Sequence, residues 1–316
     1  MVAKVFIDGE AGTTGLQIRE RLAGRRDLEL LSIAPDKRKD LDERKRLLNA
    51  ADIAILCLPD DAAKESVALI ENDTTRVIDA SSAHRVAEGW VYGFAELSRS
   101  QAEKIGHARR VSNPGCWPQG AIATLRPLVE AGIVPADHPI NVNGISGYTG
   151  GGRTMIEEYE RKGEDGNEFM PYGLTFKHKH LPELRTYARL KADPLFQPAV
   201  GNFAQGMIVM VPLHLKTLPD HAGGLALHEA IAGYYADMPN SFVDVAPLAD
   251  MERTPELNPE IYNNTNRMRL HVFANDAKGH AVLVAVYDNL GKGASGAAVQ
   301  NLNLMLGVDA ATSLAA

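Results

Sequence analysis

One of the two cysteines in this 316-residue chain lies where a turn is expected to lead into a helix. In VSNPGCWPQG, Pro114 and Gly115 favour a turn just before Cys116, and Pro118 suits the first helical position. A helix N-terminus lowers the pKa of a thiol, which favours the nucleophilic thiolate, and a nearby histidine would complete the activation. The alternative is a small buried cysteine without chemistry, as we interpret Cys57 in the apolar run AILCLP.

A second candidate site is the glycine-rich stretch DGEAGTTG, which follows the first predicted strand. Gly9, Gly12 and Gly15 are spaced three apart, and Thr13 and Thr14 complete the loop. Glycines allow the backbone to approach a pyrophosphate closely, and the following helix N-terminus attracts the anion. The spacing differs from G-x-G-x-x-G, and a purely structural turn is the alternative. Its position between a strand and a helix favours a dinucleotide site.

The residues after the second predicted strand bear on the choice between NAD and NADP. The segment LLSIAPDKRKD offers Ser32, Lys37, Arg38 and Lys39, together with the acidic Asp36. Basic side chains at this position favour a ribose 2′-phosphate, whereas an acidic one favours the free hydroxyl. A solvated helix start is the alternative, and we expect NADP(H). A nicotinamide cofactor and a thiolate together would interconvert an aldehyde and an acyl phosphate.

Residues 1–115 alternate between apolar runs and helical stretches. Strands are expected in VAKVFI, LELLSIA, ADIAILCLP and TRVIDAS, and helices in LQIRERLAGR, KRKDLDERKRLLNA and AAKESVALIEN. This alternation is typical of a Rossmann-type, doubly wound parallel sheet with helices on both faces. The sequence therefore predicts an α/β protein whose residues 1–115 form an NADP-binding domain.

Residues 116–290 predict a second, α+β domain for catalysis and oligomerisation. Strands are expected in PINVNGISG, MIVMVPLHL and RLHVFAND, and helices in QGAIATLRPLVEAGI, TMIEEYERK and GLALHEAIAGYYADM. Pro127 is expected to kink or shorten the first of these helices. A last helix, within residues 291–316, is expected to complete the first domain.

The composition excludes several classes of protein. A net charge of −7 argues against a general nucleic-acid surface, and no apolar run reaches the length of a membrane span. The first residues predict a strand rather than a signal peptide. Two cysteines are too few for a disulfide framework. The sequence has neither H-E-x-x-H nor C-x-x-C, so no metal site is predicted. A cytoplasmic protein is expected.

Several motifs, in order along the chain, resemble those of the shorter type of N-acetyl-gamma-glutamyl-phosphate reductase, a family related to the aspartate-semialdehyde dehydrogenases. They are DGEAGTTG, VIDASSAHR, VYGFAEL, SNPGCWPQGA, GISGYTGGGR, KHKHLPEL and DNLGKGASGAAVQNLNLMLG. The resemblance implies that Cys116 forms a thioacyl-enzyme and that a histidine of KHKHLPEL is the acid/base. His180 is preferred and His178 would orient the substrate, although Lys179 stands where the family commonly has arginine.

The resemblance also implies binding positions for the cofactor and the substrate. Asn289 is expected beside the cofactor, and Lys292 beside either phosphate or the nicotinamide, with an interdomain turn as the alternative. Asp79, Ser81 and Ser82 are expected near the cofactor. The substrate positions are Arg85, Asn113, Ser146, Tyr148, Arg153 and Glu183. For these residues a surface ion pair or an ordinary loop is the alternative.

The expected reaction is the NADPH-dependent reduction of N-acetyl-L-glutamyl 5-phosphate to N-acetyl-L-glutamate 5-semialdehyde and inorganic phosphate, in arginine biosynthesis. The alternatives are an aspartate-semialdehyde dehydrogenase and a non-catalytic NADP-sensing protein; a carrier-bound substrate is disfavoured, because no basic rim is evident. The resemblance suggests a homodimer or homotetramer, with no nucleic-acid or membrane partner.

Overall fold

The computed structural model describes residues 2–248 and 256–315, which form two compact units. Unit 1 is built from the residues up to Ala95, from Ser100–Gly115 and from Ala294–Ala315. Unit 2 is built from Glu96–Arg99 and Cys116–Gly293. Within the described ranges, no helix is both long enough and apolar enough to cross a membrane.

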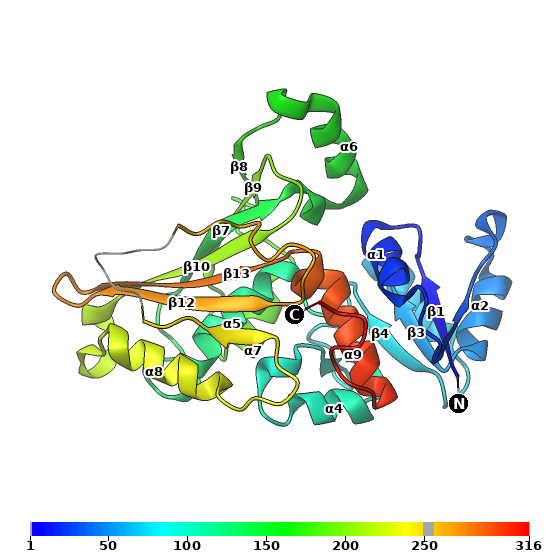
Figure 1. The fold of residues 1–316 in the computed structure, drawn as a ribbon, viewed down its shortest axis with the longest axis horizontal. Helices are drawn as coiled ribbons and strands as arrows, with labels where there is room; N and C mark the ends of the chain where they lie inside the picture. The colour runs from blue at the N-terminus through cyan, green and yellow to red at the C-terminus, as the bar shows by residue number, and fades with distance from the viewer. Residues whose placement is uncertain (1, 249–255, 316) are drawn as a thin grey trace. The chain divides into compact units, whose positions relative to one another are not determined.

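Unit 1 contains a six-stranded parallel sheet in the order β2-β1-β3-β4-β6-β5 (Figure 1). Its strands are β1 (Ala3–Asp8), β2 (Leu28–Leu31), β3 (Ile53–Leu56), β4 (Arg76–Asp79), β5 (Val91–Tyr92) and β6 (Arg110–Ser112). Its helices are α1 (Thr13–Leu22), α2 (Leu41–Ala50), α3 (Asp60–Ala68), α4 (Gln101–His107) and α9 (Gly296–Leu306). The order confirms the predicted doubly wound parallel sheet.

The strands of unit 1 are apolar on both faces because helices cover both. Val5 and Ile7 of β1 pack in one core with residues of α1, α4 and α9. Phe6, between them, points the opposite way into a second core with α2 and α3. This explains why the strands have continuous apolar runs rather than alternating ones.

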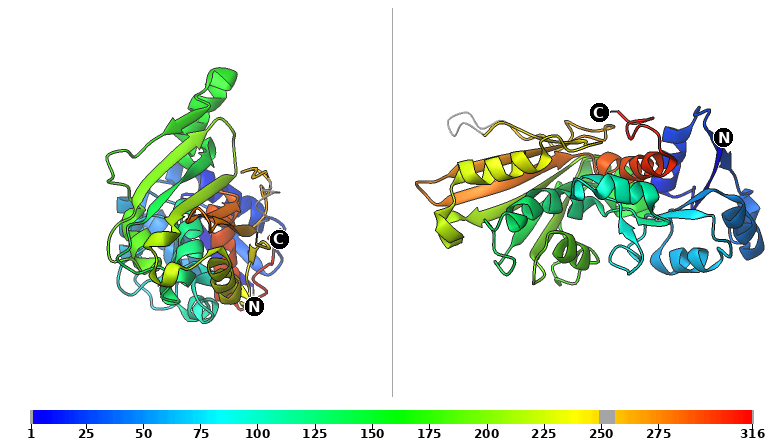
Figure 2. Two further views of the ribbon diagram at one scale, coloured as in Figure 1. Left: turned by 90° about the vertical axis from the view of Figure 1, so that its left-hand side faces the viewer. Right: turned by 90° about the horizontal axis from the view of Figure 1, so that it is seen from below.

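Unit 2 contains a mixed seven-stranded sheet in the order β11-β12-β13-β10-β7-β9-β8. Its strands are β7 (Asn141–Gly147), β8 (Phe169–Pro171), β9 (Leu195–Gly201), β10 (Met207–His214), β11 (Val243–Val245), β12 (Met268–Asn275) and β13 (His280–Tyr287). The last two form a long antiparallel hairpin, orange in Figure 2. The mixture of pairings confirms the predicted α+β character of this part of the chain.

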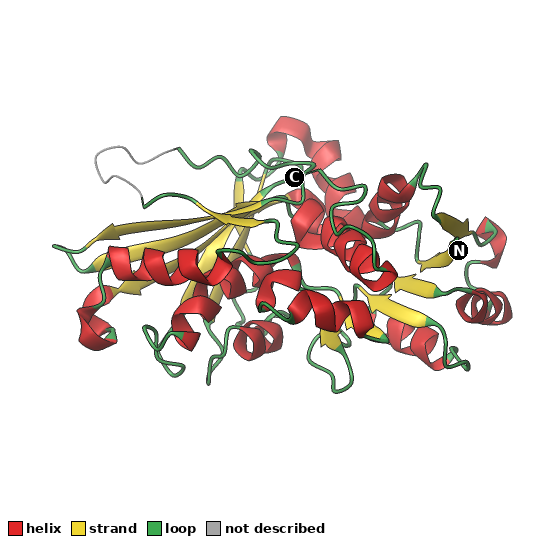
Figure 3. Cartoon of the chain, turned by 60° about the horizontal axis from the view of Figure 1, so that its bottom comes forward, coloured by secondary structure: helices red, strands yellow, loops and turns green. Residues whose placement is uncertain are grey.

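Three helices of unit 2 lie together beside this sheet (Figure 3), and a fourth, α6 (Gly152–Lys162), follows β7. They are α5 (Cys116–Glu130), α7 (Leu181–Tyr187) and α8 (Gly224–Tyr235). Helix α5 contacts β10 and β13 directly and is flanked by α7 and α8. The first residue of this central helix is the cysteine singled out by its sequence.

Pro127 does not shorten α5, which continues to Glu130. Proline has no N–H, so it leaves the carbonyl of Ala123, four residues earlier, without its helical partner. The hydroxyl of the buried Tyr235 donates to that carbonyl at 2.9 Å. A neighbouring helix therefore supplies the missing hydrogen bond, and the predicted shortening is wrong.

One further difference has a local cause. Helix α2 begins at Leu41 rather than near Lys37, because the carboxylate of Asp40 accepts from the amides of Asp42 and Glu43 and caps the helix there. The buried strands β6, β9 and β13 were not predicted.

Candidate active site

Cys116 is the first residue of α5, which begins directly after Pro114-Gly115, so the cysteine lies at a helix N-terminus as predicted. The hydroxyl of Tyr287, at the end of β13, donates to the Cys116 carbonyl at 2.5 Å and accepts from the amide of Gly120 at 3.1 Å. Burial, and then the charge of Cys116, raises the pKa of Tyr287 well above its usual value. Tyr287 therefore remains a neutral hydrogen-bonding group that fixes the first turn of the helix.

The two histidines of KHKHLPEL lie side by side just before α7. Their ring centroids are 4.7 Å apart, and the backbone amide of His180 donates to Nδ1 of His178 at 3.2 Å. His180 is buried, whereas Lys179 between them is exposed. Nδ1 of His180 lies 3.4 Å from Oε2 of Glu183, whose side chain is 1% exposed. Glu183, predicted to bind substrate, is thus placed to orient His180.

Aromatic side chains connect the histidines to the start of α5. Phe196 of β9 contacts the ring of His178 on one side and the indole of Trp117 on the other, edge to face in both cases. Tyr172 lies 5.9 Å from His178, ring centroid to ring centroid. Burial, and secondly the charge of Cys116, raises the pKa of Tyr172. The cysteine and the histidine pair are therefore parts of one cluster within unit 2.

The loop after β7 and the end of β13 meet through Asn289, which is almost fully buried. Its side chain accepts from the amide of Gly206 at 2.7 Å and donates to the hydroxyl of Thr149 at 3.1 Å. The nearby Ser146 is also buried, and its hydroxyl donates to the Gly147 carbonyl. The predicted positions Asn289 and Ser146 thus lie in one polar region.

The two other predicted substrate positions on this loop are placed differently. Tyr148 is half-buried and stacks on Tyr159 with a centroid separation of 5.0 Å. Arg153, in the first turn of α6, is exposed and forms an ion pair with Glu157 at 2.6 Å. Both residues retain polar groups for a ligand, but Arg153 also matches the surface ion pair considered as its alternative.

In unit 1 the glycine loop leads from β1 directly into α1 and needs glycine at two positions. Gly9 has φ +88°, and a β-carbon there would lie 2.3 Å from the Cys57 carbonyl oxygen. A β-carbon at Gly15 would lie 2.5 Å from the Gly9 carbonyl oxygen. Gly12 is the N-cap of α1, so the amides of Thr13 and Thr14 begin the helix. Gly9 and Gly15 are therefore required by the packing of the loop itself, and the helix N-terminus that follows can attract an anion.

Charged side chains surround the end of β2, next to this loop. Glu10 of the loop, nearly buried, forms ion pairs with Arg19 and, at 3.6 Å, with Arg38. Arg19 also donates to the hydroxyl of Ser32 at 3.2 Å. The predicted Ser32 and Arg38 thus lie around one carboxylate, and Lys37 is exposed nearby. Neither Glu10 nor Arg19 was identified from the sequence.

A pocket of about 480 Å³ opens between the glycine loop and this basic segment. Its lining includes Gly9, Glu10, Ile33, Arg38 and Lys39. On its inner side Asp8 accepts from Arg44 at 3.1 Å and from Ser66 at 2.8 Å. The lining also includes the carboxylates of Asp8, Glu10 and Glu65, so the pocket offers groups of both charges beside an apolar wall.

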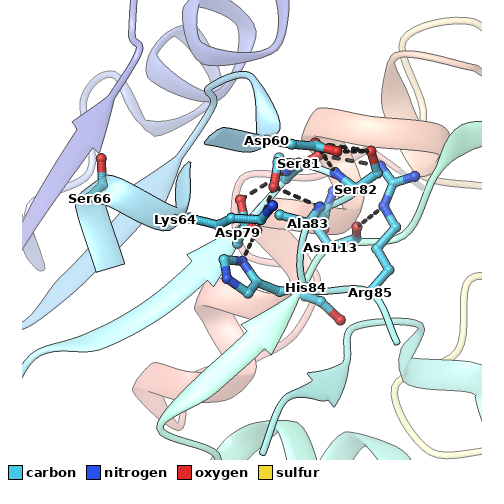
Figure 4. A network of polar contacts seen from close by, with 12 residues as sticks. Asp60, Lys64, Ser66, Asp79, Ser81, Ser82, Ala83, His84, Arg85 and Asn113 are labelled. Atoms are coloured by element: carbon cyan, nitrogen blue, oxygen red, sulfur yellow. Dashed lines mark hydrogen bonds and ion pairs between the residues drawn. The ribbon is translucent and has the colours of Figure 1, made fainter. Parts of the chain in front are cut away.

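The motif VIDASSAHR forms a polar network at the end of β4 (Figure 4). The fully buried Asp79 accepts from the amide and hydroxyl of Ser81 and lies 2.6 Å from Nδ1 of His84, whose ring stacks on Trp90. Ser82 donates to Asp60. The motif therefore organises its own loop.

Arg85 and Asn113 are both buried, and Nε of Arg85 donates to the Asn113 carbonyl at 3.2 Å. The Asn113 side chain donates to the carbonyl of Ala294 at 3.0 Å and accepts from Asn301 at 3.1 Å. The side-chain amide of Asn113 is thus engaged by one backbone carbonyl and one side chain of unit 1. This environment favours a structural part for Asn113 over the predicted contact with substrate.

Two family models together match most of the chain. The model described as the NAD binding domain of semialdehyde dehydrogenases matches residues 4–105, and the one described as their dimerisation domain matches residues 116–289. The boundary between the matches falls just before Cys116. The domain that holds the glycine loop is thus NAD(P)-binding, as predicted.

Full-length relatives share much of the sequence. A protein of Chelativorans sp. named N-acetyl-gamma-glutamyl-phosphate reductase is 69% identical over 97% of this chain and 99% of its own length. A protein of the same name from Mesorhizobium japonicum is 67% identical over 98% of this chain and 100% of its own. In Nostoc sp., N-acetyl-gamma-glutamyl-phosphate reductase 2 is 52% identical over 96% of this chain and 97% of its own.

Solved structures share the fold at low identity. An aspartate semialdehyde dehydrogenase II from Vibrio cholerae superposes with a TM-score of 0.71 at 15% identity, covering 97% of this chain and 98% of that one. An aspartate semialdehyde dehydrogenase with NADP from Candida albicans has a TM-score of 0.64 at 13% identity, covering 98% and 99%. These likenesses establish the fold.

Proposed function

This chain belongs to the N-acetyl-gamma-glutamyl-phosphate reductase family, and from that premise we propose its reaction: the NADPH-dependent reduction of N-acetyl-L-glutamyl 5-phosphate to N-acetyl-L-glutamate 5-semialdehyde. The single observation that carries the proposal is the 69% identity to a reductase of that name over nearly the whole chain. The reaction would serve arginine biosynthesis. The cysteine at the start of α5, with a histidine–carboxylate pair in the same unit, supplies the chemistry that such a reaction needs.

Cys116 would act as the nucleophile. Its thiolate sulfur attacks the acyl carbon, the new S–C bond forms, and the bond from that carbon to the phosphate oxygen breaks, so inorganic phosphate leaves. The first amides of α5 would stabilise the developing oxyanion. When bound, NADPH supplies the hydride that reduces the resulting thioester. The S–C bond then breaks, and the sulfur returns to the thiolate.

His180 would hold and move the protons of these steps. Glu183 next to Nδ1 favours the tautomer with its proton on that nitrogen, which leaves Nε2 as the acid/base. Nε2 first accepts the thiol proton of Cys116 and later exchanges a proton with the substrate oxygen. His178, half-buried beside it, would orient the substrate.

Replacing each histidine separately with alanine distinguishes the two roles. A loss of kcat is expected for His180→Ala and a higher KM for His178→Ala.

NADP(H) would be bound by unit 1. The glycine loop, with Thr13 and Thr14, would bind the pyrophosphate, and Ser32, Lys37 and Arg38 would bind the 2′-phosphate. Asn289 would contact the nicotinamide end. Arg19, hydrogen-bonded to Ser32, would join the 2′-phosphate group of residues.

The substrate would be an acylated amino acid with two anionic groups. Arg85 and Arg153 would attract them, and Ser146 and Tyr148 would donate hydrogen bonds to the acyl chain. We further propose a homodimer or homotetramer built on the sheet of unit 2, in agreement with the dimerisation-domain match. The proposed location of the enzyme is the cytoplasm.

The test is the reverse reaction, in which N-acetyl-glutamate semialdehyde reduces NADP⁺ only when inorganic phosphate is present. Formation of NADPH is followed by absorbance, with Cys116→Ser in parallel. Phosphate-dependent activity that disappears in the variant supports the proposal. Activity with aspartate semialdehyde and none with N-acetyl-glutamate semialdehyde would show that the enzyme is an aspartate-semialdehyde dehydrogenase. Binding of NADP(H) without turnover of either aldehyde would favour a non-catalytic NADP-sensing protein.

A further inference from the structure

Lys292 forms a fully buried ion pair with Glu96, although the two residues are far apart in the sequence. Nζ lies 2.8 and 2.7 Å from the two carboxylate oxygens, and the side chains are 1% and 0% exposed. The ammonium is therefore directed into the interior of unit 2. This geometry does not support the phosphate contact that the sequence suggested for Lys292.

The pair joins three segments of unit 2. Glu96 belongs to the short stretch Glu96–Arg99, and its Oε1 also accepts from the amide of Phe242 at 2.9 Å. Nζ of Lys292 lies 5.7 Å from the centre of the Phe242 ring. A buried ion pair adds little net stability compared with apolar residues of the same volume. What it does provide is a fixed position for the turn that carries Lys292.

The backbone of that turn contacts the first turn of α5. Nε2 of Gln119 donates to the Lys292 carbonyl at 2.8 Å. Gln119 is buried, and no described residue donates a hydrogen bond to its Oε1. Its side chain is therefore held by the hydrogen bond from Nε2 to the Lys292 carbonyl. A β-carbon at Gly293 would lie 3.0 Å from Cβ of Cys116. The turn is thus packed directly against the cysteine.

We propose that Glu96 and Lys292 are positioning residues, whose ion pair holds residues 291–293 against Cys116 and so fixes the orientation of its side chain. The proposal rests on the role of Cys116 as the nucleophile given above. In this proposal the ammonium group of Lys292 pairs with Glu96 inside unit 2, and other residues bind the phosphate. Small displacements of a reacting group cost much of its rate, so the reactivity of the thiol reports on this turn.

The direct readout is alkylation of Cys116 by iodoacetamide, in which the thiolate displaces iodide, quantified on the Cys116 peptide by mass spectrometry. The double variant E96Q/K292M removes both charges while nearly keeping both shapes, so neither charge is left buried alone. We expect alkylation about tenfold slower across the pH range, with kcat falling in parallel and the KM for phosphate unchanged. K191M, which removes a lysine from an exposed ion pair with Asp137 in the same unit, is the control.

Gly293→Ala tests the same contact and leaves the ion pair intact. The added methyl group would lie 3.0 Å from Cβ of Cys116 and 3.1 Å from the Asp288 carbonyl oxygen, so the contact with the cysteine has to adjust, and we again expect about tenfold slower alkylation. Gly233→Ala is the matched control, because nothing lies within 4 Å of a β-carbon there. If circular dichroism shows that E96Q/K292M does not fold, the alkylation rate of Gly293→Ala tests the contact between this turn and Cys116.

Normal alkylation in folded Gly293→Ala, or in folded E96Q/K292M, would overturn the proposal. So would a higher KM for phosphate with normal alkylation, which would make Lys292 a phosphate contact. If the wild type has no reductase activity, the proposed reaction fails, but the alkylation rates still test the positioning.

Discussion

His180 and Glu183 lie one helical turn apart at the start of α7, both buried, with Nδ1 3.4 Å from Oε2. Glu183→Gln keeps the shape and removes the charge that orients the imidazole. We expect kcat to fall about 10- to 100-fold, with little change in the KM for either substrate. Steady-state kinetics of the phosphate-dependent reaction measure this. Glu158→Gln, on the surface of α6, is the control. A change in melting temperature with unaltered kcat would show that Glu183 serves only the fold.

Arg19 is predicted to help select NADPH over NADH, because its guanidinium lies 3.2 Å from the hydroxyl of Ser32. Removing one charged hydrogen-bond donor from the 2′-phosphate weakens binding by about tenfold. Arg19→Ala should therefore raise the Kd for NADPH and leave that for NADH unchanged. Titration of the nicotinamide fluorescence measures both, with the exposed Arg26→Ala as control. An equal loss for both nucleotides would place Arg19 outside the specificity site.

Cys57 is predicted to be unreactive near neutral pH. Burial, followed by the charges of Asp79 and Asp8, raises the pKa of its thiol to about 12. Because the thiolate is the reactive form, its fraction rises only as the pH approaches that value. Brief treatment with iodoacetamide near neutral pH should label Cys116 and leave Cys57 unlabelled, as peptide mass spectrometry will show. In the urea-unfolded chain both cysteines should be labelled. Equal labelling of the folded protein would contradict the environment described for Cys57.

Tyr235→Phe should destabilise unit 2, because it leaves the buried Ala123 carbonyl without its donor. The expected loss in the free energy of unfolding is about 1–3 kcal/mol. In a Pro127→Ala background residue 127 regains an N–H, which can satisfy that carbonyl. The cost of Tyr235→Phe should then shrink. Urea unfolding of the two single variants and the double variant measures the difference. The same cost in both backgrounds would mean that Tyr235 stabilises α5 by packing alone.

His271 is predicted to make the protein less stable in mild acid. Burial, and then Arg269, lowers the pKa of His271 below its usual value of 6.5. The unfolded chain therefore takes up the proton first. Stability is unaffected above about pH 6.5 and is lost as the pH falls from there toward the folded pKa. His271→Gln should lose less unfolding free energy between about pH 7.5 and about pH 5.5 than the wild type. The exposed His107→Gln should behave like the wild type.

The parts of the fold that could be predicted are those whose signal is local. The strands β1, β3 and β4 are short apolar runs because both of their faces are buried, and the start of α5 after Pro114-Gly115 is signalled by its own residues. By contrast, the start of α2 depends on one side chain, that of Asp40. The continuation of α5 past Pro127 depends on a tyrosine of another helix. No pattern within α5 could reveal that partner.

The site divides in the same way. Cys116, His180 and the glycine loop are recognisable by type and spacing. Tyr287, Glu96 and Arg19 are ordinary residues in their local sequence, and each acquires its contact only when distant segments come together. The resemblance suggested substrate as the partner of Glu183, and in the structure its carboxylate lies beside His180.

The division of the chain between the units has a consequence for synthesis on the ribosome. Unit 1 draws Ala298, Val299, Leu302 and Met305 of α9 into the core shared with β1 and α1. These residues are translated after unit 2, so the strands β1–β6 and helices α1–α4 emerge with this core incomplete. Unit 2, whose sheet and central helix are complete by Gly293, can close earlier. The half of the protein that is made first is thus the half that folds last, and a released fragment of residues 1–115 should be prone to aggregate.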